Sequence, residues 1–401
     1  MLAVVAFTLA TMIQGTVVGW QVYELTHSTL DLGLIGLAEA LPFIGASLFA
    51  GHVADRYDRR LVTIVSLIAV LGSAVALLAL PEFLGTSPTS LVSAIFGVIV
   101  VSGLARSFVH PARQALGAEL VPRELFPQSV TWRSGAWQLA AVAGPAIGGA
   151  LYAIGGARLA YAVDAALIVI GIFLLVAVRR TPPPPHRSTE SIGSSLVAGV
   201  RFVFGERIVL GALSLDLFSV LFGGATALLP VYAAEILHVG PQGLGLLRSA
   251  PAIGAVITSV VLTHAKPFQH TGRLLLRCVA IFGLTIIVFG VSTNFYIAGA
   301  ALVAGGAADM VSVFIRSTLL TLRTPPEMLG RVMSVNGIFV GSSNEIGAFE
   351  SGVTASWFGT VPSVVLGGTM TLVVVAVTAW RNPMLRRLGR MEAAVEVPRP
   401  G

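Results

Sequence analysis

Charged side chains are scarce in this chain of 401 residues. Asp, Glu, Lys and Arg make up 11% of it, whereas 55% of the residues are hydrophobic. A soluble domain carries roughly 25% charged residues, so this composition excludes a water-soluble globular protein. The apolar runs reach the length of about 20 residues that an α-helix needs to cross a bilayer. The sequence therefore predicts an all-α membrane protein with many spans.

Cysteine is almost absent as well. Cys278 is the single cysteine and lies in an apolar run, which excludes an internal disulfide framework and a multi-cysteine metal site. The chain also has no HExxH, GxSxG or phosphate-binding loop, and its histidines fall mostly in loops. We therefore expect no catalytic residues, no metal and no cofactor. A membrane-embedded enzyme would need one of these groups.

Lysine occurs once, as Lys266, and the other 24 of the 25 basic residues are arginines. The net charge of +6 does not indicate a nucleic-acid partner, because that requires a basic face with polar surroundings. Here the arginines stand between apolar runs. No basic residue precedes Arg56, so a secretory signal peptide is not expected. The first apolar segment is predicted to be an uncleaved span, with a short cytoplasmic lead missing before it.

Apolar runs and helix breakers predict twelve spans in two sets of six. The first set is 2–23, 32–53, 61–80, 90–109, 129–153 and 158–178; the second is 208–234, 242–264, 274–291, 295–317, 332–354 and 361–380. Between the sets, the four prolines Pro182–Pro185 cannot continue a helix. The predicted organisation is an N-terminal half (1–180), a cytoplasmic linker (181–207), a C-terminal half (208–380) and a cytoplasmic tail (381–401). Residues 191–207 suit an interfacial amphipathic helix.

The basic residues predict the topology. With the N-terminus inside, 23 of the 25 fall in loops or the tail on one side, and only Arg158 and Arg248 lie toward the other side. Cytoplasmic loops carry the excess of arginine and lysine. We therefore expect both termini to be cytoplasmic. The expected location is the inner membrane of a bacterium, and the expected state is a monomer.

The two halves resemble each other in sequence. A shift of 203 residues pairs Gly103 with Gly306, Arg113 with Arg316, Pro122 with Pro325, Glu124 with Glu327 and Gly144 with Gly347. Earlier in each half, a shift of 212 pairs Leu32–Leu34 with Leu244–Leu246. Two six-span repeats that meet at a central cavity are typical of alternating-access transporters.

The loop after the second span reads G-H-V-A-D-R-Y-D-R-R from Gly51 to Arg60. It resembles the signature loop of the major facilitator superfamily, which implies a conformational latch made by Gly51, Asp55, Arg56, Arg59 and Arg60. Asp55 can cap a neighbouring helix N-terminus, and Arg59 can hold that carboxylate.

This loop departs from the superfamily pattern at Asp58, where the pattern prefers glycine. The equivalent loop of the second half, His264–Phe268, has no acidic residue. Only the first half can therefore carry a full latch, and the cytoplasmic gate is expected to be asymmetric.

The fifth span contains G-P-A-I-G-G, with Gly144, Pro145, Gly148 and Gly149. It resembles the glycine-proline motif of exporters in the same superfamily, especially proton-coupled drug antiporters. Small residues also let helix backbones approach closely, so generic helix packing is the alternative explanation. The copy in the second half lacks the proline.

Further segments resemble one branch of the superfamily, the enterobactin-exporter and macrolide-efflux branch. They are W-Q-V-Y-E-L-T-H-S-T from Trp20 to Thr29, His110–Arg113, Leu120–Glu124 and Thr324–Arg331. The resemblance implies twelve helices and proton-driven export of a small molecule, but it does not fix the substrate.

Six acidic residues fall within the predicted spans, where an ionised group costs at least about 2.5 kcal/mol at mid-bilayer. They are Glu39, Asp164, Asp216, Asp309, Glu345 and Glu350. Burial disfavours the charged form, so such a carboxylate can take up a proton. Glu39, Asp309, Glu345 and Asp216 are the candidates for proton or substrate binding, and Asp164 is predicted to be structural.

Arginines near the spans have two interpretations. Arg248 lies inside the outer part of the eighth span and could pair with Glu39, as a structural contact, or bind an anionic substrate. Arg106, Arg113 and Arg316 are expected to extend toward lipid phosphates or to pair with Glu124 and Glu327.

The leading prediction is secondary active export of a small amphipathic molecule, drug-like or siderophore-like, in exchange for protons. Uptake or uniport on the same fold is the alternative, and a non-transporting receptor or scaffold is a third. The expected partners are a small-molecule substrate, protons and the lipid bilayer.

Overall fold

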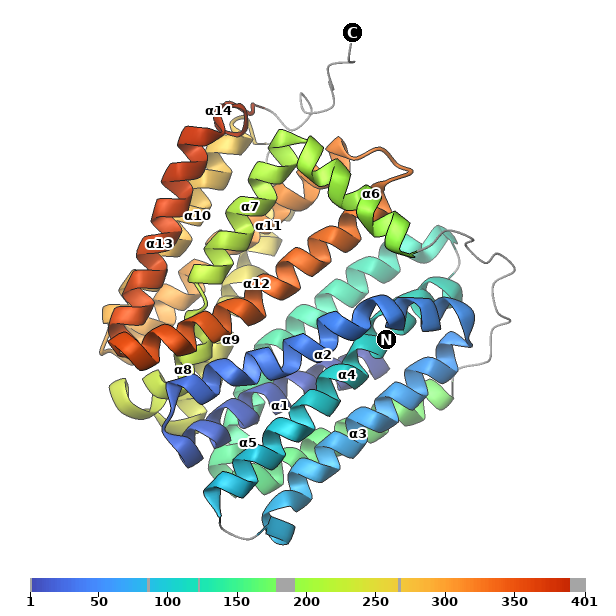
Figure 1. Cartoon of the computed structure of the whole chain (residues 1–401), viewed down its shortest axis with the longest axis vertical. Helices are drawn as coiled ribbons and strands as arrows, with labels where there is room; N and C mark the ends of the chain where they lie inside the picture. Colours follow the sequence, from blue (N-terminus) through green and yellow to red (C-terminus); the bar gives the residue numbers. More distant parts are fainter. Residues whose placement is uncertain (1, 85–86, 122, 178–191, 266–267, 390–401) are drawn as a thin grey trace. The chain divides into compact units, whose positions relative to one another are not determined.

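A computed structural model describes residues 2–84, 87–121, 123–177, 192–265 and 268–389 (Figure 1). Nearly all of these described residues are helical, and none of them forms a strand. The prolines 182–185 of the predicted linker and the last part of the predicted tail lie outside the described residues. The helices are α1 (Leu2–Thr26), α2 (Thr29–Arg56), α3 (Arg59–Leu84), α4 (Pro88–Leu120), η1 (Arg123–Leu125), α5 (Phe126–Val176), α6 (Ile192–Gly205), α7 (Arg207–Phe222), η2 (Ala225–Leu228), α8 (Leu229–Val231), the π-helix η3 (Tyr232–Ile236), α9 (Gly240–His264), α10 (Thr271–Val291), α11 (Phe295–Arg323), α12 (Leu329–Phe358), α13 (Thr360–Arg381) and α14 (Pro383–Arg386).

The 51-residue α5 consists of two helices joined by a kink. Gly155 (φ −138°, ψ 19°) and Gly156 (φ 64°, ψ −167°) leave the helical conformation, and the positive φ of Gly156 is one that glycine adopts readily. Ten segments of the described chain are long and apolar enough to span a membrane, and one of them, Gln128–Val176, contains this kink. With the kinked segment counted as two spans and the 30-residue α12 added, the predicted fold of twelve helices is confirmed.

The chain divides into two compact units. The first comprises Met1–Thr189 and Ala227–Ser249, and the second comprises Glu190–Thr226 and Ala250–Gly401. In the first unit, α1 packs along α5, α2 packs on α4, and α3 packs on both α4 and α5. In the second unit, α10 packs on α11 and α13, and α7 packs on α12 and α13.

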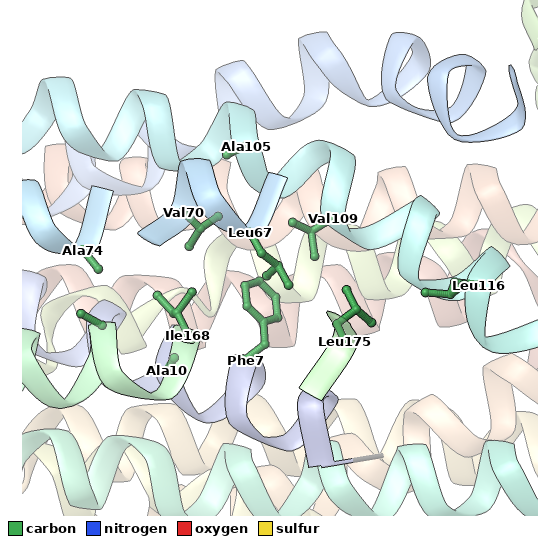
Figure 2. Packing of buried hydrophobic residues seen from close by; sticks show 11 residues of the cluster. Phe7, Ala10, Leu67, Val70, Ala74, Ala105, Val109, Leu116, Ile168 and Leu175 are labelled. Atoms are coloured by element: carbon green, nitrogen blue, oxygen red, sulfur yellow. The ribbon is translucent and has the colours of Figure 1, made fainter. Parts of the chain in front are cut away.

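The core of the first unit is hydrophobic where these helices meet. Figure 2 shows Phe7 of α1 among Leu67 of α3, Val109 of α4 and Leu175 of α5. All four side chains are buried. Burying such side chains between helices requires close shape complementarity, because lipid tails are as apolar as leucine and dispersion contacts must hold the helices together.

The seventh span is discontinuous. α7 ends at Phe222, and a Cβ placed on Gly224 would lie only 2.6 Å from the carbonyl oxygen of Gly347 in α12. The short η2, α8 and η3 follow. The division between the two units falls inside this span, after Thr226. The break in the helix therefore lies close to the point where the chain passes from the second unit to the first.

Helix packing within each unit repeats at the two predicted shifts. A Cβ on Gly103 of α4 would lie 2.6 Å from the carbonyl oxygen of Glu39 in α2. In the second unit, a Cβ on Gly306 of α11 would lie 2.6 Å from Cα of Pro251 in α9. Gly306 follows Gly103 by 203 residues and Pro251 follows Glu39 by 212. These two backbone contacts are therefore equivalent under the predicted repeat shifts.

Candidate functional site

A polar cluster joins three membrane-spanning helices of the first unit. Arg106 of α4 forms an ion pair with Glu39 of α2 through Nη1 and Oε1. Its Nη2 donates a second hydrogen bond to Oε1 of Gln14 in α1. The Arg106 side chain is 15% exposed and the Glu39 side chain 34% exposed. The proposed pair of Glu39 with Arg248 was therefore wrong, because Arg106 already neutralises this carboxylate.

Asp164 adds a second carboxylate to this unit, on the second half of α5. It is fully buried, and neither of its oxygens has a hydrogen-bond partner. Arg106 acts on it electrostatically, and Nε of Arg106 is itself buried without a hydrogen-bond partner. One turn before Asp164, Tyr161 donates to Oε1 of Gln21 over 2.6 Å.

Asp164 and Arg106 were assigned no transport role from the sequence. An acid in an otherwise uninterrupted apolar span was the available indication for Asp164. Arg106 had no comparable indication, because it lies three residues before the end of the predicted fourth span, 90–109. The cluster is therefore an arginine with one paired carboxylate and one unpaired carboxylate, in helices that cross the membrane.

Arg248 contacts the backbone of α1. Its Nη1 donates to the carbonyl oxygen of Gly15 over 2.6 Å, and a Cβ on Gly19 would lie 3.5 Å from the same nitrogen. Both contacts are within the first unit, because the start of α9 belongs to it. The binding of an anionic substrate by Arg248 stays a prediction.

In the second unit, Arg316 of α11 forms an ion pair with Asp216 of α7, and each side chain is 7% exposed. The expectation that Arg316 extends to lipid phosphates or pairs with Glu327 was therefore wrong. Asp309 occupies the repeat position of Arg106, 203 residues later. No hydrogen bond or ion pair joins Asp309 to another described residue, and its side chain is half-buried. Glu345 is half-buried on α12.

The structure describes the side chains of only some residues of the signature loop. The side chain of Asp55 and the surroundings of Gly51 lie outside what the structure describes, so the latch stays a prediction. Arg56 is exposed. Arg60 donates from Nε to the carbonyl oxygen of Leu175 over 3.3 Å and from Nη2 to that of Val176. It thereby binds the last carbonyl groups of α5, which have no partner inside the helix.

Asp58, the departure from the superfamily pattern, caps α3. Its Oδ1 accepts hydrogen bonds from the backbone N–H groups of Arg60 at 2.9 Å and Leu61 at 3.2 Å. A carboxylate suits this position because the first N–H groups of a helix have no partner within it. Arg59, which begins α3, is half-buried.

The glycine-proline motif lies where α5 packs closely on α1 and on the start of α9. A Cβ on Gly148 would lie 3.2 Å from Cα and O of Ile13 in α1, and a Cβ on Gly149 would lie 3.0 Å from Cα of Gly245 in α9. Gly144 contacts α1 even more closely, and a Cβ on Gly245 would meet the carbonyl oxygen of Pro145. The motif therefore serves close backbone packing within the first unit.

The segment that contains Trp20–Thr29 makes two tyrosine–carboxylate hydrogen bonds. Tyr23 of α1 donates to Oε1 of Glu235 in the π-helix η3, and Tyr152 of α5 donates to Oε2 of Glu24. Tyr23 and Glu235 are 212 residues apart, which is the shift that relates the early spans of the two repeats. These hydrogen bonds fix the C-terminal end of α1 to α5 and η3.

Comparison with known proteins identifies the class. Residues 1–399 match the family described as "Transmembrane secretion effector", and the chain belongs to this family of major facilitator superfamily transporters. It is a multi-pass membrane transporter and not an enzyme.

Curated relatives are named as enterobactin exporters. The chain is 27% identical over 383 residues to the enterobactin exporter EntS of Citrobacter koseri, with 92% of this chain and 89% of that protein covered. It is 29% identical over 387 residues to EntS of Shigella flexneri, with the same coverage.

Solved structures support the fold. A bacterial homologue of the human lysosomal transporter Spinster, in an inward-facing and unoccupied conformation, superposes with a TM-score of 0.73 at 15% identity and 98% coverage of both chains. The inward-open xylose transporter XylE from E. coli gives a TM-score of 0.71 at 13% identity, with 98% of this chain and 97% of that chain covered.

Proposed function

We propose that this transporter exports a small amphipathic molecule, siderophore-like or drug-like, in exchange for protons and by alternating access. The observation that carries the proposal is the cluster of Glu39, Arg106 and Asp164, which places two carboxylates near one arginine inside membrane-spanning helices. The relatives named as enterobactin exporters support the direction and the class of cargo.

The cluster can couple proton binding to a change of partner. Arg106 neutralises Glu39, and Asp164 is buried without a hydrogen-bond donor. A buried charge without a partner is costly, so the two carboxylates compete for Arg106. When Glu39 binds a proton, its attraction for Arg106 is lost, and Arg106 can then pair with the carboxylate of Asp164. Proton binding would thus transfer the ionic contact of α4 from α2 to α5.

The packing of this unit provides rigid elements for such a change. The close contacts of Gly144 and Gly148 hold α5 against α1, so rotation of one helix displaces the other. The discontinuous seventh span is also consistent with alternating access, because broken helices commonly form the substrate and ion sites of secondary transporters.

The direct test is efflux from energised inverted membrane vesicles that contain the full chain. Enterobactin-like catecholates, macrolides and dyes are supplied outside the vesicles, and accumulation inside is measured with and without a protonophore. We expect accumulation of at least one of these compounds that stops when the proton gradient is removed. Accumulation that is insensitive to the protonophore would disprove proton exchange.

Variants separate the roles of the two carboxylates. Glu39→Gln and Asp164→Asn should each abolish gradient-driven accumulation while leaving membrane insertion unchanged, because neither variant can release a proton at that position. Glu82→Gln is the matched control, since Glu82 is 61% exposed and forms a surface ion pair with Arg158. If both cluster variants accumulate substrate like the control, the cluster is structural.

A further inference from the structure

A cavity of about 940 Å³ lies within the first unit, and its lining includes Arg113 and Arg133. It is formed by the beginning of α1, the end of α4 and both ends of α5, and its wall is mostly hydrophobic, including Leu2, Val4, Leu125 and Leu174. Leu116 and Leu175 line it and belong to the packed core beneath it, which Figure 2 shows around Phe7. The cavity therefore borders a closely packed part of the first unit.

Two arginines from different helices face this cavity. Arg113 of α4 and Arg133 of α5 both line it. Gly117 lies one turn after Arg113 on the same face of α4, and a Cβ on Gly117 would lie 3.2 Å from Nη1 of Arg133. The guanidinium group of Arg133 thus rests on α4, next to the turn that carries Arg113.

Neither guanidinium group is neutralised by a carboxylate among the described residues. Arg113 stacks over the ring of Phe7, with 5.5 Å from Cζ to the ring centroid, and its Nη1 is buried without a hydrogen-bond partner. Two like charges in a mostly apolar cavity are unfavourable, because each loses hydration and repels the other. An anion bound between them would satisfy both groups.

The rim of the cavity suggests the kind of anion. Trp132 is 70% exposed and Trp137 is 49% exposed, and both line the cavity. Tryptophan prefers the level of the lipid headgroups, and basic pockets between membrane helices bind anionic headgroups. The volume is in the range of about 300–1,000 Å³ that holds a drug-sized molecule, so it exceeds what a lone phosphate needs.

We propose that this cavity binds an anionic phospholipid, with its phosphate between Arg113 and Arg133. The planar guanidinium groups suit phosphate because each can donate two parallel hydrogen bonds. The glycerol and the upper acyl chains then lie against Trp132, Trp137 and the leucines of the wall. The site is separate from the cluster of Glu39 and Arg106, and it does not depend on which cargo the transporter moves.

Native mass spectrometry of the purified full chain tests this proposal, with phosphatidylglycerol and phosphatidylcholine added in equal amounts. The wild type should retain phosphatidylglycerol preferentially. Arg113→Gln and Arg133→Gln should each weaken its retention about 10-fold, since a hydrogen bond to a charged group is lost. Arg158→Gln is the matched control, because Arg158 is exposed and lies outside the cavity.

Two further variants keep the test decisive if a glutamine variant fails to fold. Arg113→Lys with Arg133→Lys preserves the charge but not the paired hydrogen bonds, so it should retain phosphatidylglycerol at an intermediate level. Gly117→Leu introduces a side chain where Arg133 rests and should reduce retention without removing a charge.

Several outcomes would overturn the proposal. Equal retention of the two lipids by the wild type would show an apolar groove with no headgroup selectivity. Unchanged retention in the glutamine variants would show that the arginines do not bind the lipid. Displacement of the lipid by inorganic phosphate alone would assign the site to a free anion, and displacement by a catecholate siderophore would assign it to cargo.

Discussion

Gly306 of α11 faces the backbone of Pro251 in α9, and its replacement by alanine should destabilise the protein measurably. A Cβ at this position would lie 2.6 Å from both Cα and the carbonyl carbon of Pro251, and closer still to the carbonyl oxygen. Real Cβ contacts are essentially never shorter than 3.0 Å. The two helices must therefore separate by at least about 0.4 Å, the difference between 2.6 and 3.0 Å, and overpacking of this kind costs about 1–3 kcal/mol.

The same helix offers a matched control. A Cβ on Gly299 would have no neighbour within 4 Å, so Gly299→Ala should be neutral or stabilise α11 by roughly 0.5–1 kcal/mol through helix propensity. Thermal unfolding of the two variants in detergent is the assay. With an unfolding entropy of about 2.1 cal/mol/K per residue, each kcal/mol lost should lower the Tm of this chain of 401 residues by roughly 1 °C. We expect Gly306→Ala to melt a few degrees below Gly299→Ala.

The repeat makes a second comparison available. Gly103 faces Glu39 as Gly306 faces Pro251, and Gly97, on the same helix as Gly103, has no neighbour within 4 Å. Gly103→Ala should therefore lose stability relative to Gly97→Ala. Equal melting temperatures within both pairs would refute the inference that close backbone contacts hold the equivalent helices together.

Substitutions at three other residues test further features. Arg316→Gln should lose about 3–5 kcal/mol of stability, because it leaves the buried carboxylate of Asp216 unpaired; a Tm like that of the wild type would show that the pair is dispensable. Asp58→Ala should lose about 0.5–2 kcal/mol through loss of the helix cap, and Asp58→Asn should restore most of it in the same melting assay. Asp55→Asn should abolish efflux without preventing insertion, and normal efflux would contradict the latch hypothesis.

Local sequence patterns were sufficient for the spans. A membrane helix must satisfy its own backbone hydrogen bonds in lipid, so an apolar run of sufficient length predicts a span without knowledge of its neighbours. The break between the fifth and sixth spans was likewise predictable, because Gly155 and Gly156 interrupt the apolar run and glycine adopts the required backbone. The repeat shifts of 203 and 212 residues were also visible in the sequence, because they rest on matching residues at fixed spacing.

Side-chain partners were not predictable in this way. Glu39 and Arg106 are 67 residues apart, and their contact depends on how α2 and α4 rotate about their axes. From the sequence, Arg248 was a candidate partner of Glu39, but Arg248 contacts Gly15. Arg316 was expected to meet lipid or Glu327, but the packing of α7 on α11 buries it with Asp216.

The scarcity of charge therefore determined by itself that this chain crosses a membrane many times, because the hydrophobic effect and backbone hydrogen bonding act on each segment separately. Only the tertiary structure decided which of the few charged groups neutralise one another. In a medium of low dielectric constant the cost of an isolated charge is large. The helix packing that brings Arg106 to Glu39 leaves Asp164 buried without a hydrogen-bond partner.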